Sequence, residues 1–410
     1  MKSNRSLHLL LLFCIFILPL IPAMFDRGYE EIKVLFLLYS MSIVVVFFSL
    51  IAVLKKIRVR LTKISTMLIL FLISLLVTSF TGINPEQSLL GTSPYFQGLV
   101  TFLFLSIFSY ILSQTSINER KIYQTLIASA SVISSIALIQ FISLLLGREV
   151  TTYAGRVIST FGQPNFFAGY LLFIIPLQLV LIRKALKYER VFLLVSLSLS
   201  ILAIAVSFSR TAIILCAILI SLWLISISMK TKVKRIILIC LVVGGIGYAL
   251  ISSKIIQEEF IQPITKQTVE MANVQKRVFI WQVAIAQIEK HPILGYGLEN
   301  IGEVYPKQYD FNHPKPAFYH MLKDLNIDNT HNLFLNLFLW GGGVVTLVFC
   351  LLIFTLWRTA KSNVLKIGLI VFILWSLLQN LSITHWFCFY LFAGLISKQS
   401  IDSKNSNTIQ

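Results

Sequence analysis

The chain has 410 residues, of which 57% are hydrophobic and only 13% are charged. This balance excludes an ordinary soluble protein, in which about a quarter of the residues are charged. The net charge of +18 does not indicate nucleic-acid binding, because the basic residues lie in short loops between apolar runs. Most of these runs have about 17–25 residues, the length of a helix that crosses a bilayer. We predict an all-α fold, a polytopic membrane helix bundle of about 12 transmembrane helices.

The apolar runs define the predicted spans in chain order. The first resembles a signal peptide, but no small-residue cleavage site follows it, so we expect it to be retained. The spans cover residues 7–25, 32–54, 64–80, 98–113, 122–146, 166–182, 191–208, 211–229, 236–252 and 331–357, and two more share 367–396 with a break near 382–385. Nine spans therefore occupy residues 1–252. A large loop with short helices follows at 253–330, then three spans at 331–397 and a short tail at 398–410.

The distribution of basic residues predicts the orientation. With a cytoplasmic N-terminus, most of the 35 Lys and Arg residues fall in cytoplasmic loops and tails. The short outer turns hold only Arg27, Lys33, Arg148, Arg156 and Arg210. Short cytoplasmic loops are the ones enriched in Lys and Arg. We therefore expect both termini in the cytoplasm and the loop 253–330 outside it. The sequence has no nucleotide-binding motif, which agrees with a site in a compartment without nucleotides.

The cysteines and loop histidines do not indicate a metal. All the cysteines lie inside apolar runs and are expected to be small buried hydrophobic residues rather than disulfides or zinc ligands; they are Cys14, Cys216, Cys240, Cys350 and Cys388. The spacing of the loop histidines, His291, His313, His320 and His331, matches no ligand motif with a defined geometry. We expect no metal and no other cofactor.

Arg210 lies between the seventh and eighth spans, which almost no loop separates. A cation at membrane depth usually has a functional partner. The alternative is an arginine that extends to the lipid headgroups. The tight turn favours function, because it leaves the side chain little freedom to avoid the protein interior.

A second polar feature comes before the sixth span. Arg156 precedes a segment in which Gly162 and Pro164 flank Gln163, and Asn165 follows. Such a sequence predicts a fixed, non-helical entry into the span, which must be covered by protein or line a wet cavity. A plain helix-entry turn with Asn165 as N-cap explains it equally well.

The third feature is a predicted helix from Asn273 to Glu289, ended by His291-Pro292. Its residues are apolar almost all round, so we expect it to be buried or to lie in the membrane interface. Arg277 and Trp281 are one turn apart and share a face. Residues 292–297 then read as a tight turn and fail as a dinucleotide-binding fingerprint.

His331 and Asn332 stand where the polar loop meets the apolar run of the tenth span. His331 is either a helix-entry residue in the headgroup zone or a catalytic group at the outer membrane surface.

In their order, these motifs resemble the O-antigen ligase and O-antigen polymerase family of membrane glycosyltransferases. The matching set is Gly155-Arg156, Thr160 to Asn165, Ser209-Arg210, Arg277, Trp281, Pro292 to Gly297, and His331-Asn332 followed by Gly341-Gly342-Gly343. Two departures are Gln163, where the family often has Asn, and a short tail without helical repeats. The resemblance covers about residues 150–345.

The resemblance implies a metal-independent enzyme that moves a glycan from undecaprenyl diphosphate to an acceptor hydroxyl. The acceptor is a glycolipid, a polysaccharide or a protein, and the site faces outward from the bacterial cytoplasmic (inner) membrane. Arginine forks match phosphate oxygens, so Arg210 and Arg277 are expected to bind the diphosphate with help from Arg156. His331 is the expected general base, and attack from the opposite face inverts the anomeric carbon. Substrate-binding residues are expected to be Arg156, Gln163, Asn165, Trp281 and Asn332.

Other functions remain open at this point. Within the family, the chain is a ligase, a polymerase or a protein O-oligosaccharyltransferase. Outside it, a lipid-linked sugar flippase would also have many spans, but such a transporter should show an inverted repeat and broken helices near the midplane. We find no repeat, and the polar residues gather at the outer face. A purely structural membrane protein leaves Arg210 unexplained.

Overall fold

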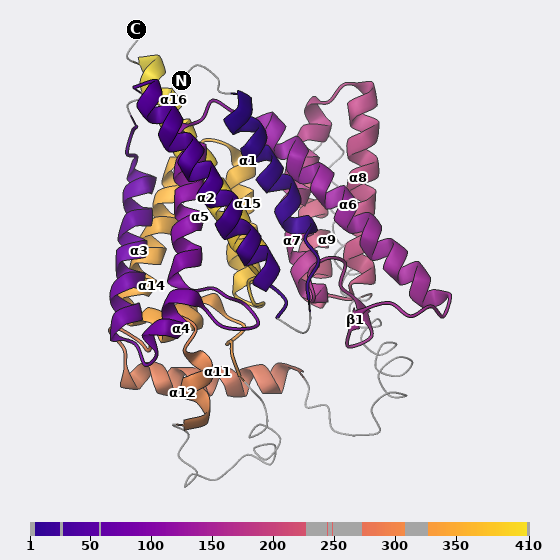
Figure 1. Cartoon of the computed structure of the whole chain (residues 1–410). Coiled ribbons are helices and arrows are strands. Elements are labelled where there is room, and N and C mark those ends of the chain that lie inside the picture. The colour runs from indigo at the N-terminus through magenta and orange to yellow at the C-terminus, as the bar shows by residue number, and fades with distance from the viewer. Residues whose placement is uncertain are drawn as a thin grey trace. The chain divides into compact units, whose positions relative to one another are not determined.

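The computed structural model describes residues 5–24, 28–56, 59–226, 244, 248, 273–307 and 327–407. Within these residues the chain is almost entirely α-helical, as predicted, with one two-stranded hairpin (Figure 1). The chain divides into two compact units. Unit 1 comprises Met1–Ser40, Ser116–Gln267 and Ser362–Trp375, and unit 2 comprises Met41–Thr115, Thr268–Lys361 and Ser376–Gln410.

The helices and strands of each unit come from distant parts of the sequence. Unit 1 contains α1 (Arg5–Ile17), the 3-10 helix η1 (Leu18–Leu20), the start of α2 (Glu31–Leu54), α6 (Glu119–Leu145), β1 (Thr152–Tyr153), β2 (Arg156–Val157), α7 (Pro164–Lys184), α8 (Lys187–Val206), α9 (Arg210–Ser226) and α15 (Asn363–Ser376). Unit 2 contains the rest of α2, α3 (Lys63–Thr81), α4 (Pro85–Leu90), α5 (Leu99–Gln114), α11 (Asn273–Lys290), α12 (Ile301–Lys307), α14 (Leu333–Thr359) and α16 (Ile383–Asn407).

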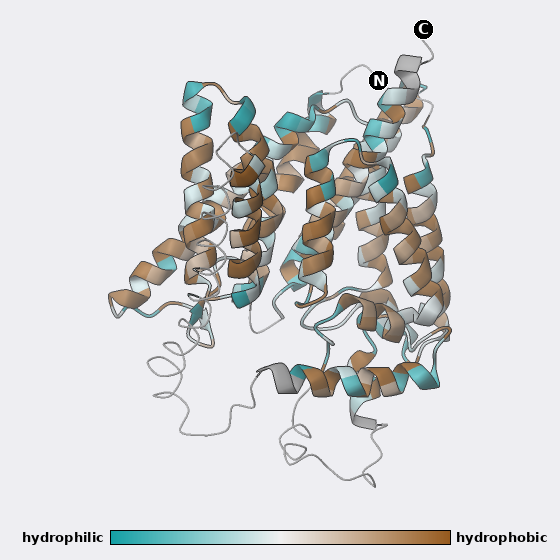
Figure 2. Cartoon of the chain, turned by 180° about the vertical axis from the view of Figure 1, so that it is seen from behind, coloured by the Kyte–Doolittle hydropathy of each residue, from teal (hydrophilic) through white to brown (hydrophobic). Residues whose placement is uncertain are grey.

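Each predicted span other than the ninth, most of which lies outside the described residues, contains one of these helices. Six are long and apolar enough to cross a membrane: α2, α3, α6, α7, α8 and α14. Shorter apolar helices cover Arg5–Leu20, Leu99–Gln114, Arg210–Ser226 and Asn363–Ser376. Most of the helical ribbon is brown, the colour of apolar residues (Figure 2). The chain is a multi-pass membrane protein. The count of twelve remains a prediction, because span 236–252, apart from residues 244 and 248, and much of the loop 253–330 fall outside the described residues.

Helix α7 forms the core of unit 1. Every residue from Phe166 to Leu179 is buried, as expected for a helix that is apolar on all sides. Its one buried carboxamide, Gln178, donates to the hydroxyls of Ser196 and Ser200 on α8, at 2.8 and 3.2 Å. Polar side chains that bond between membrane helices hold the helices in one register.

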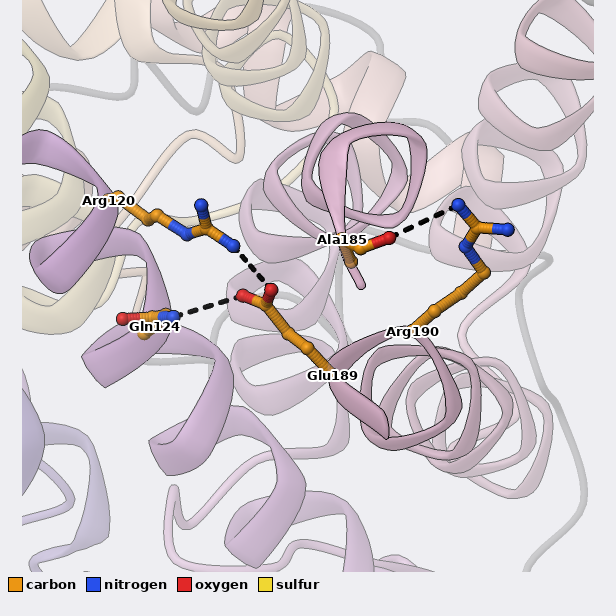
Figure 3. Close-up of polar contacts among 5 residues, drawn as sticks. All are labelled: Arg120, Gln124, Ala185, Glu189 and Arg190. Carbon is orange, nitrogen blue, oxygen red and sulfur yellow. Dashed lines mark hydrogen bonds and ion pairs between the residues drawn. The ribbon is translucent and has the colours of Figure 1, made fainter. Parts of the chain in front are cut away.

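Charged and polar groups join α6 to α8 at the N-terminal ends of both helices (Figure 3). Glu189 of α8 forms an ion pair with Arg120 and accepts a hydrogen bond from Gln124 at 3.1 Å. Arg190 donates to the carbonyl oxygen of Ala185, 3.1 Å away. This end of α8 is opposite to the end that reaches Ser207, where Arg156 and Arg210 lie.

Unit 2 is built on two helix pairs, α3 with α14 and α5 with α16. Aromatic rings fill the space among them. The Phe102 ring meets Trp386 edge-on, with centroids 5.0 Å apart, and Phe349 lies 5.4 Å from Phe71. Aromatic pairs in such geometries add stability beyond the area that they bury. Unit 2 therefore has its own rigid core.

Helix α11 crosses the ends of α3 and α14 instead of running beside them (Figure 1). It ends at Lys290, one residue beyond the prediction. Phe279, Ile280 and Val283 are buried, whereas Val278 and Ile285 are 44% and 49% exposed. The helix therefore has apolar residues on a buried face and on an exposed face, which agrees with the predicted position at a membrane interface.

A break in α14 receives the predicted turn at residues 292–297. Gly342 has φ 59° and ψ −156°, which interrupts the helix. The freed carbonyl of Trp340 accepts from the amide of Gly297 at 2.9 Å, and the freed amide of Gly343 donates to the carbonyl of Pro292 at 2.7 Å. Non-helical backbone in a membrane protein must find such partners within the protein.

One part of the cysteine prediction is wrong. Cys14, Cys216 and Cys388 are buried, but Cys350 is exposed on α14. It shares the outward face of that helix with the exposed Leu347. An apolar span has a face that only lipid covers, so an apolar neighbourhood in sequence does not make a residue part of the core. Cys240 lies outside the described residues.

Candidate functional site

A tight β-hairpin in unit 1 presents Arg156. β1 pairs antiparallel with β2, and Ala154 and Gly155 form the loop between them. Both loop residues have positive φ angles, 49° and 69°. Two positive φ angles are the mark of a type I′ turn, which matches the twist of the strands and favours glycine. The hairpin fixes the backbone from which Arg156 projects.

The Arg156 guanidinium reaches the C-terminal end of α8. Its Nε and Nη2 donate to the Ser207 carbonyl oxygen at 2.9 and 2.7 Å, and Nη2 also donates to Asn165 Oδ1 at 3.3 Å. The last carbonyls of a helix lack intrahelical partners, so a cation is favourable there. Burial and the positive charge of Arg210 lower the pKa of Arg156 to about 10. Arg156 therefore stays cationic at neutral pH.

Arg210 is the first residue of α9 and lies near enough to Arg156 for their charges to repel. Its side chain is exposed. The expectation that the turn directs it into the protein interior is therefore wrong, because the turn lies at a helix end from which a long side chain extends outward. Neither arginine has an acidic partner among the described residues. The buried hydroxyl of Ser209, the residue before Arg210, has no hydrogen-bond partner among them either. We call Arg156 and Arg210 the arginine pair.

Residues 159–163, the entry segment, lead into α7 as a fixed non-helical stretch. Gly162 has a φ of 73°, and a Cβ there would lie 2.9 Å from atoms of Ala23 and Tyr29. Gln163 occupies the N-cap position of α7 without a side-chain capping bond. The alternative with Asn165 as N-cap is wrong, because Pro164 begins the helix and Asn165 Oδ1 instead accepts from Arg156.

Lys33 supports the entry segment, and the sequence did not single it out. It is fully buried, donates to the Thr160 carbonyl oxygen at 3.0 Å, and lies 3.9 Å from the centre of the Phe161 ring. A buried lysine needs such partners, here a carbonyl and an aromatic face. The available signal was a charge in the first turn of an apolar helix, which we assigned to a short outer turn.

In unit 2, α11 holds Arg277 and Trp281 on one face, as predicted. The indole Nε1 of Trp281 donates to the Thr330 carbonyl oxygen at 2.8 Å. Nη1 of Arg277 donates to the carbonyl oxygen of Leu378, in the connection before α16, at 2.8 Å. Burial lowers the pKa of Arg277, and no carboxylate pairs with it among the described residues. The structure thus brings Trp281 to the residue that precedes His331.

Side-chain hydrogen bonds fix residues 329–332, the histidine turn. The His331 amide donates to Asn329 Oδ1 at 2.9 Å, and the Thr330 hydroxyl donates to Asn336 Oδ1 at 2.6 Å. Asn332 is the N-cap of α14, and its Oδ1 accepts from the amides of residues 334 and 335. His331 has a φ of 56°, a conformation that costs energy for most side chains. The half-buried His331 is therefore held in place by its neighbours.

Two carboxylates near the histidine turn were not predicted as site residues. Glu299 Oε2 accepts from the amide and the hydroxyl of Thr92, each at 3.4 Å. Burial, opposed by the Thr92 amide and reinforced by the charge of Asp328, raises the pKa of Glu299 to about 7. Nothing in the sequence around Glu299 indicates this, because Thr92 and Glu299 are far apart in the chain.

The eight predicted site residues thus fall into two sets. Unit 1 holds Arg156, Gln163, Asn165 and Arg210, and unit 2 holds Arg277, Trp281, His331 and Asn332. The first set offers two cations suited to an anion, and the second offers a cation, a histidine on a fixed backbone and a nearby carboxylate. Among the described residues no group of His, Cys, Asp and Glu side chains could hold a metal ion; His313 and His320 lie outside them.

Comparisons with known proteins agree with the motifs. Residues 195–350 match the model of a family described as O-antigen ligase. A curated relative, the ComP-specific O-oligosaccharyltransferase of Acinetobacter baylyi, is 26% identical over 204 residues. That match covers 50% of this chain and 35% of the relative, so the chain spans about a third of that protein's length. The resemblance is therefore confirmed for residues 195–350 of this multi-pass membrane protein, which match the O-antigen ligase family.

Proposed function

We propose that the protein transfers a glycan from undecaprenyl diphosphate to an acceptor hydroxyl, as an O-antigen ligase-type glycosyltransferase. The acceptor oxygen bonds to the anomeric carbon while the bond from that carbon to the diphosphate oxygen breaks. The electron pair of that bond goes to the diphosphate, and His331 takes the hydroxyl proton. Attack opposite to the leaving group inverts the anomeric centre.

The arginine pair is the observation that carries this proposal. Two neighbouring guanidinium groups without an acidic partner among the described residues are unfavourable together, and an anion between them relieves the repulsion. Guanidinium groups bind phosphate oxygens in a bidentate manner. Fixed donors that meet charge developing on a leaving group are the strongest catalytic device in most enzymes. Arg277, half-buried and also without an acidic partner there, is proposed as the third diphosphate ligand.

The remaining assignments follow from position. Gln163, Asn165, Trp281 and Asn332 are proposed to bind substrate, because they adjoin the arginine pair or the histidine turn in their respective units.

We propose that residues 1–252 and 331–397 cross the cytoplasmic membrane of a bacterium, that both termini are cytoplasmic and that residues 253–330 face outward. A cysteine placed at Gln308 should then react with an impermeant thiol reagent in cells whose inner membrane is intact. Labelling only after lysis would refute this orientation.

A direct test uses purified protein in detergent with a polyprenyl diphosphate that carries a labelled oligosaccharide. Wild-type protein should move the label to an acceptor and release polyprenyl diphosphate. Arg156→Gln should weaken donor binding. The control is Arg148→Gln, which removes an exposed charge just after the C-terminal end of α6 and should bind donor normally. Equal donor binding by the wild type and Arg156→Gln would exclude the arginine pair as the diphosphate site.

The match to an O-oligosaccharyltransferase favours one second candidate, a protein acceptor. The chemistry at the donor is the same, and only the source of the hydroxyl differs. Mass spectrometry of envelope proteins and of the surface polysaccharide, with and without the gene, separates the alternatives. Loss of glycan from a protein serine or threonine supports the protein acceptor. Loss of long glycans from lipid supports the ligase, and shortened free polymer supports a polymerase.

A further inference from the structure

A small cavity in unit 2 lies beside the histidine turn, with room for about one water molecule. Carboxamides and indoles provide most of its lining: Gln97, Asn329, Asn336, Gln379, Trp340 and Trp386. Carboxamides both donate and accept hydrogen bonds. The ligand that such a cavity favours therefore depends on which of these atoms are already bonded.

The carboxamide oxygens of the turn are occupied. Asn336 Oδ1 accepts from the amide and the hydroxyl of Thr330, at 3.0 and 2.6 Å. Asn329 Oδ1 accepts from the amide of His331 and from Asn336 Nδ2, at 2.9 and 3.0 Å. The same bonds hold the backbone of His331 in place. The groups of the two asparagines that remain to be bonded are N–H donors. They are the second hydrogen of Asn336 Nδ2 and the Nδ2 group of Asn329, which has no partner among the described residues.

Gln97 and Trp386 bond to each other: Gln97 Oε1 accepts one hydrogen bond, from Trp386 Nε1 at 3.0 Å, and Gln97 Nε2 donates to the Leu381 carbonyl at 2.6 Å. Trp340 is different. It is 2% exposed, and its Nε1 has no hydrogen-bond partner among the described residues. A buried N–H without an acceptor is unfavourable. The cavity therefore has in its lining an indole N–H that requires an acceptor oxygen, together with the two asparagines that keep N–H groups to donate.

The charge next to the cavity restricts that oxygen to a neutral one. The backbone amide of Gln97 bonds to the carboxyl group of Glu299, and Asp328 is near that group. An anion in the cavity would be repelled by Asp328 and by Glu299 in its ionised form. Water, a sugar hydroxyl or an acetamido carbonyl meets both requirements.

From these contacts we propose that the cavity is a subsite for one neutral oxygen of a glycan, received by Trp340 Nε1 and the two asparagine amides. The identification of the ligand as a glycan rests on the proposed function. The subsite makes Trp340 and Asn329 specificity residues that hold a sugar beside His331. The donor sugar and the acceptor sugar offer the same chemistry, so the experiment must distinguish them.

Binding can be measured without turnover. The full-length chain, with nitrogen-15 in the indoles of its six tryptophans, gives one N–H resonance for each, and Trp340→Phe identifies that of Trp340. Two probes are added in turn: a short-chain polyprenyl diphosphate disaccharide, and a lipid-free oligosaccharide of the host's surface glycan. A shift of the Trp340 resonance with one probe supports the subsite and names its source. No shift with either probe at saturation would mean that the cavity holds only water, and would overturn the proposal.

Kinetics provide the second arm. Trp340→Phe should raise the KM for the glycan that shifts the resonance by roughly 2- to 10-fold, the effect of one hydrogen bond, with kcat little changed. Asn329→Asp keeps the oxygen that holds the turn but replaces the donor, and should raise the same KM. Trp375→Phe, which removes a buried indole from α15 in unit 1, is the matched control and should leave the same KM unchanged. Unchanged KM values for both glycans would overturn the subsite alone, whereas absence of transfer by wild-type protein would refute the proposed function.

Discussion

The amide nitrogen of Tyr296 donates to the carbonyl oxygen of Leu339, 2.7 Å away. This bond joins a surface turn to the interior of a membrane helix, and it forms because Gly341 and Gly342 leave helical geometry. The freed backbone groups of α14 and the turn at residues 292–297 satisfy one another. Unit 2 thereby acquires a rigid link between α11, which holds Arg277 and Trp281, and the helix that begins after His331.

Gly342→Ala should break this link. The residue has a φ of 59°, and a Cβ there would lie 2.2 Å from the carbonyl carbon of Ile293. A side chain at such a position costs about 1–3 kcal/mol for the backbone alone, and the clash adds to it. We expect a lower apparent Tm in detergent. Gly343→Ala is the control, because its Cβ would meet only the Pro292 carbonyl oxygen, at 3.4 Å. An unchanged Tm for Gly342→Ala would mean that the turn is not docked as described.

Arg210→Lys should remove most of the transfer activity although the charge is kept. Lysine cannot form the two-pronged contact with a diphosphate. Loss of one donor to a developing charge lowers the rate by roughly 100- to 1,000-fold. The measurement is single-turnover transfer with saturating donor, at matched protein levels. Near-normal turnover would return Arg210, which is exposed, to the role of a headgroup-contacting residue.

His331→Ala should slow transfer by roughly 100- to 10,000-fold, the usual contribution of a general base. Donor binding should change little, because the arginines hold the diphosphate. The positive φ of His331 supplies a control. Asparagine adopts this conformation readily but cannot take the proton, so His331→Asn should be stable and equally slow. Activity restored by asparagine would make His331 structural and move the base to a carboxylate such as Asp328.

Glu299 should make stability depend on pH. Its pKa in the folded protein, about 7, lies above the ordinary glutamate value, so the folded state binds the proton more tightly than the unfolded state. Stability should therefore fall as pH rises from about 4.5 to about 7 and then level off. Glu299→Gln, permanently neutral, should flatten this slope in apparent Tm. Glu303→Gln, on α12, should keep it. An identical slope in wild type and Glu299→Gln would assign the pH effect to other groups.

Transfer should survive EDTA. The proposed mechanism neutralises the diphosphate with arginines, and the loop histidines lack ligand spacing in the sequence. The assay is single-turnover transfer with and without chelator, with readdition of Mg²⁺, Mn²⁺ or Zn²⁺. Loss of activity that one divalent metal restores would contradict the mechanism.

The sequence alone determined the helices, because each apolar run must satisfy its own backbone in lipid and therefore forms a helix wherever it occurs. It also determined the turn at residues 292–297, since glycine and proline act locally on the backbone. Arg156, Arg210, Arg277 and His331 could be selected as candidates because charge and polarity at membrane depth are uncommon whatever the tertiary structure.

Only the tertiary structure decided which groups meet. Lys33 lies at the Thr160 carbonyl, Glu299 at Thr92 and Trp281 at Thr330, and none of these pairs has a signal in the local pattern. The exposure of Arg210 and Cys350 was likewise decided by which face of each helix packs. Helical periodicity gives the faces of a span, but in a chain that is apolar throughout it does not tell which face meets protein and which meets lipid, because both are apolar.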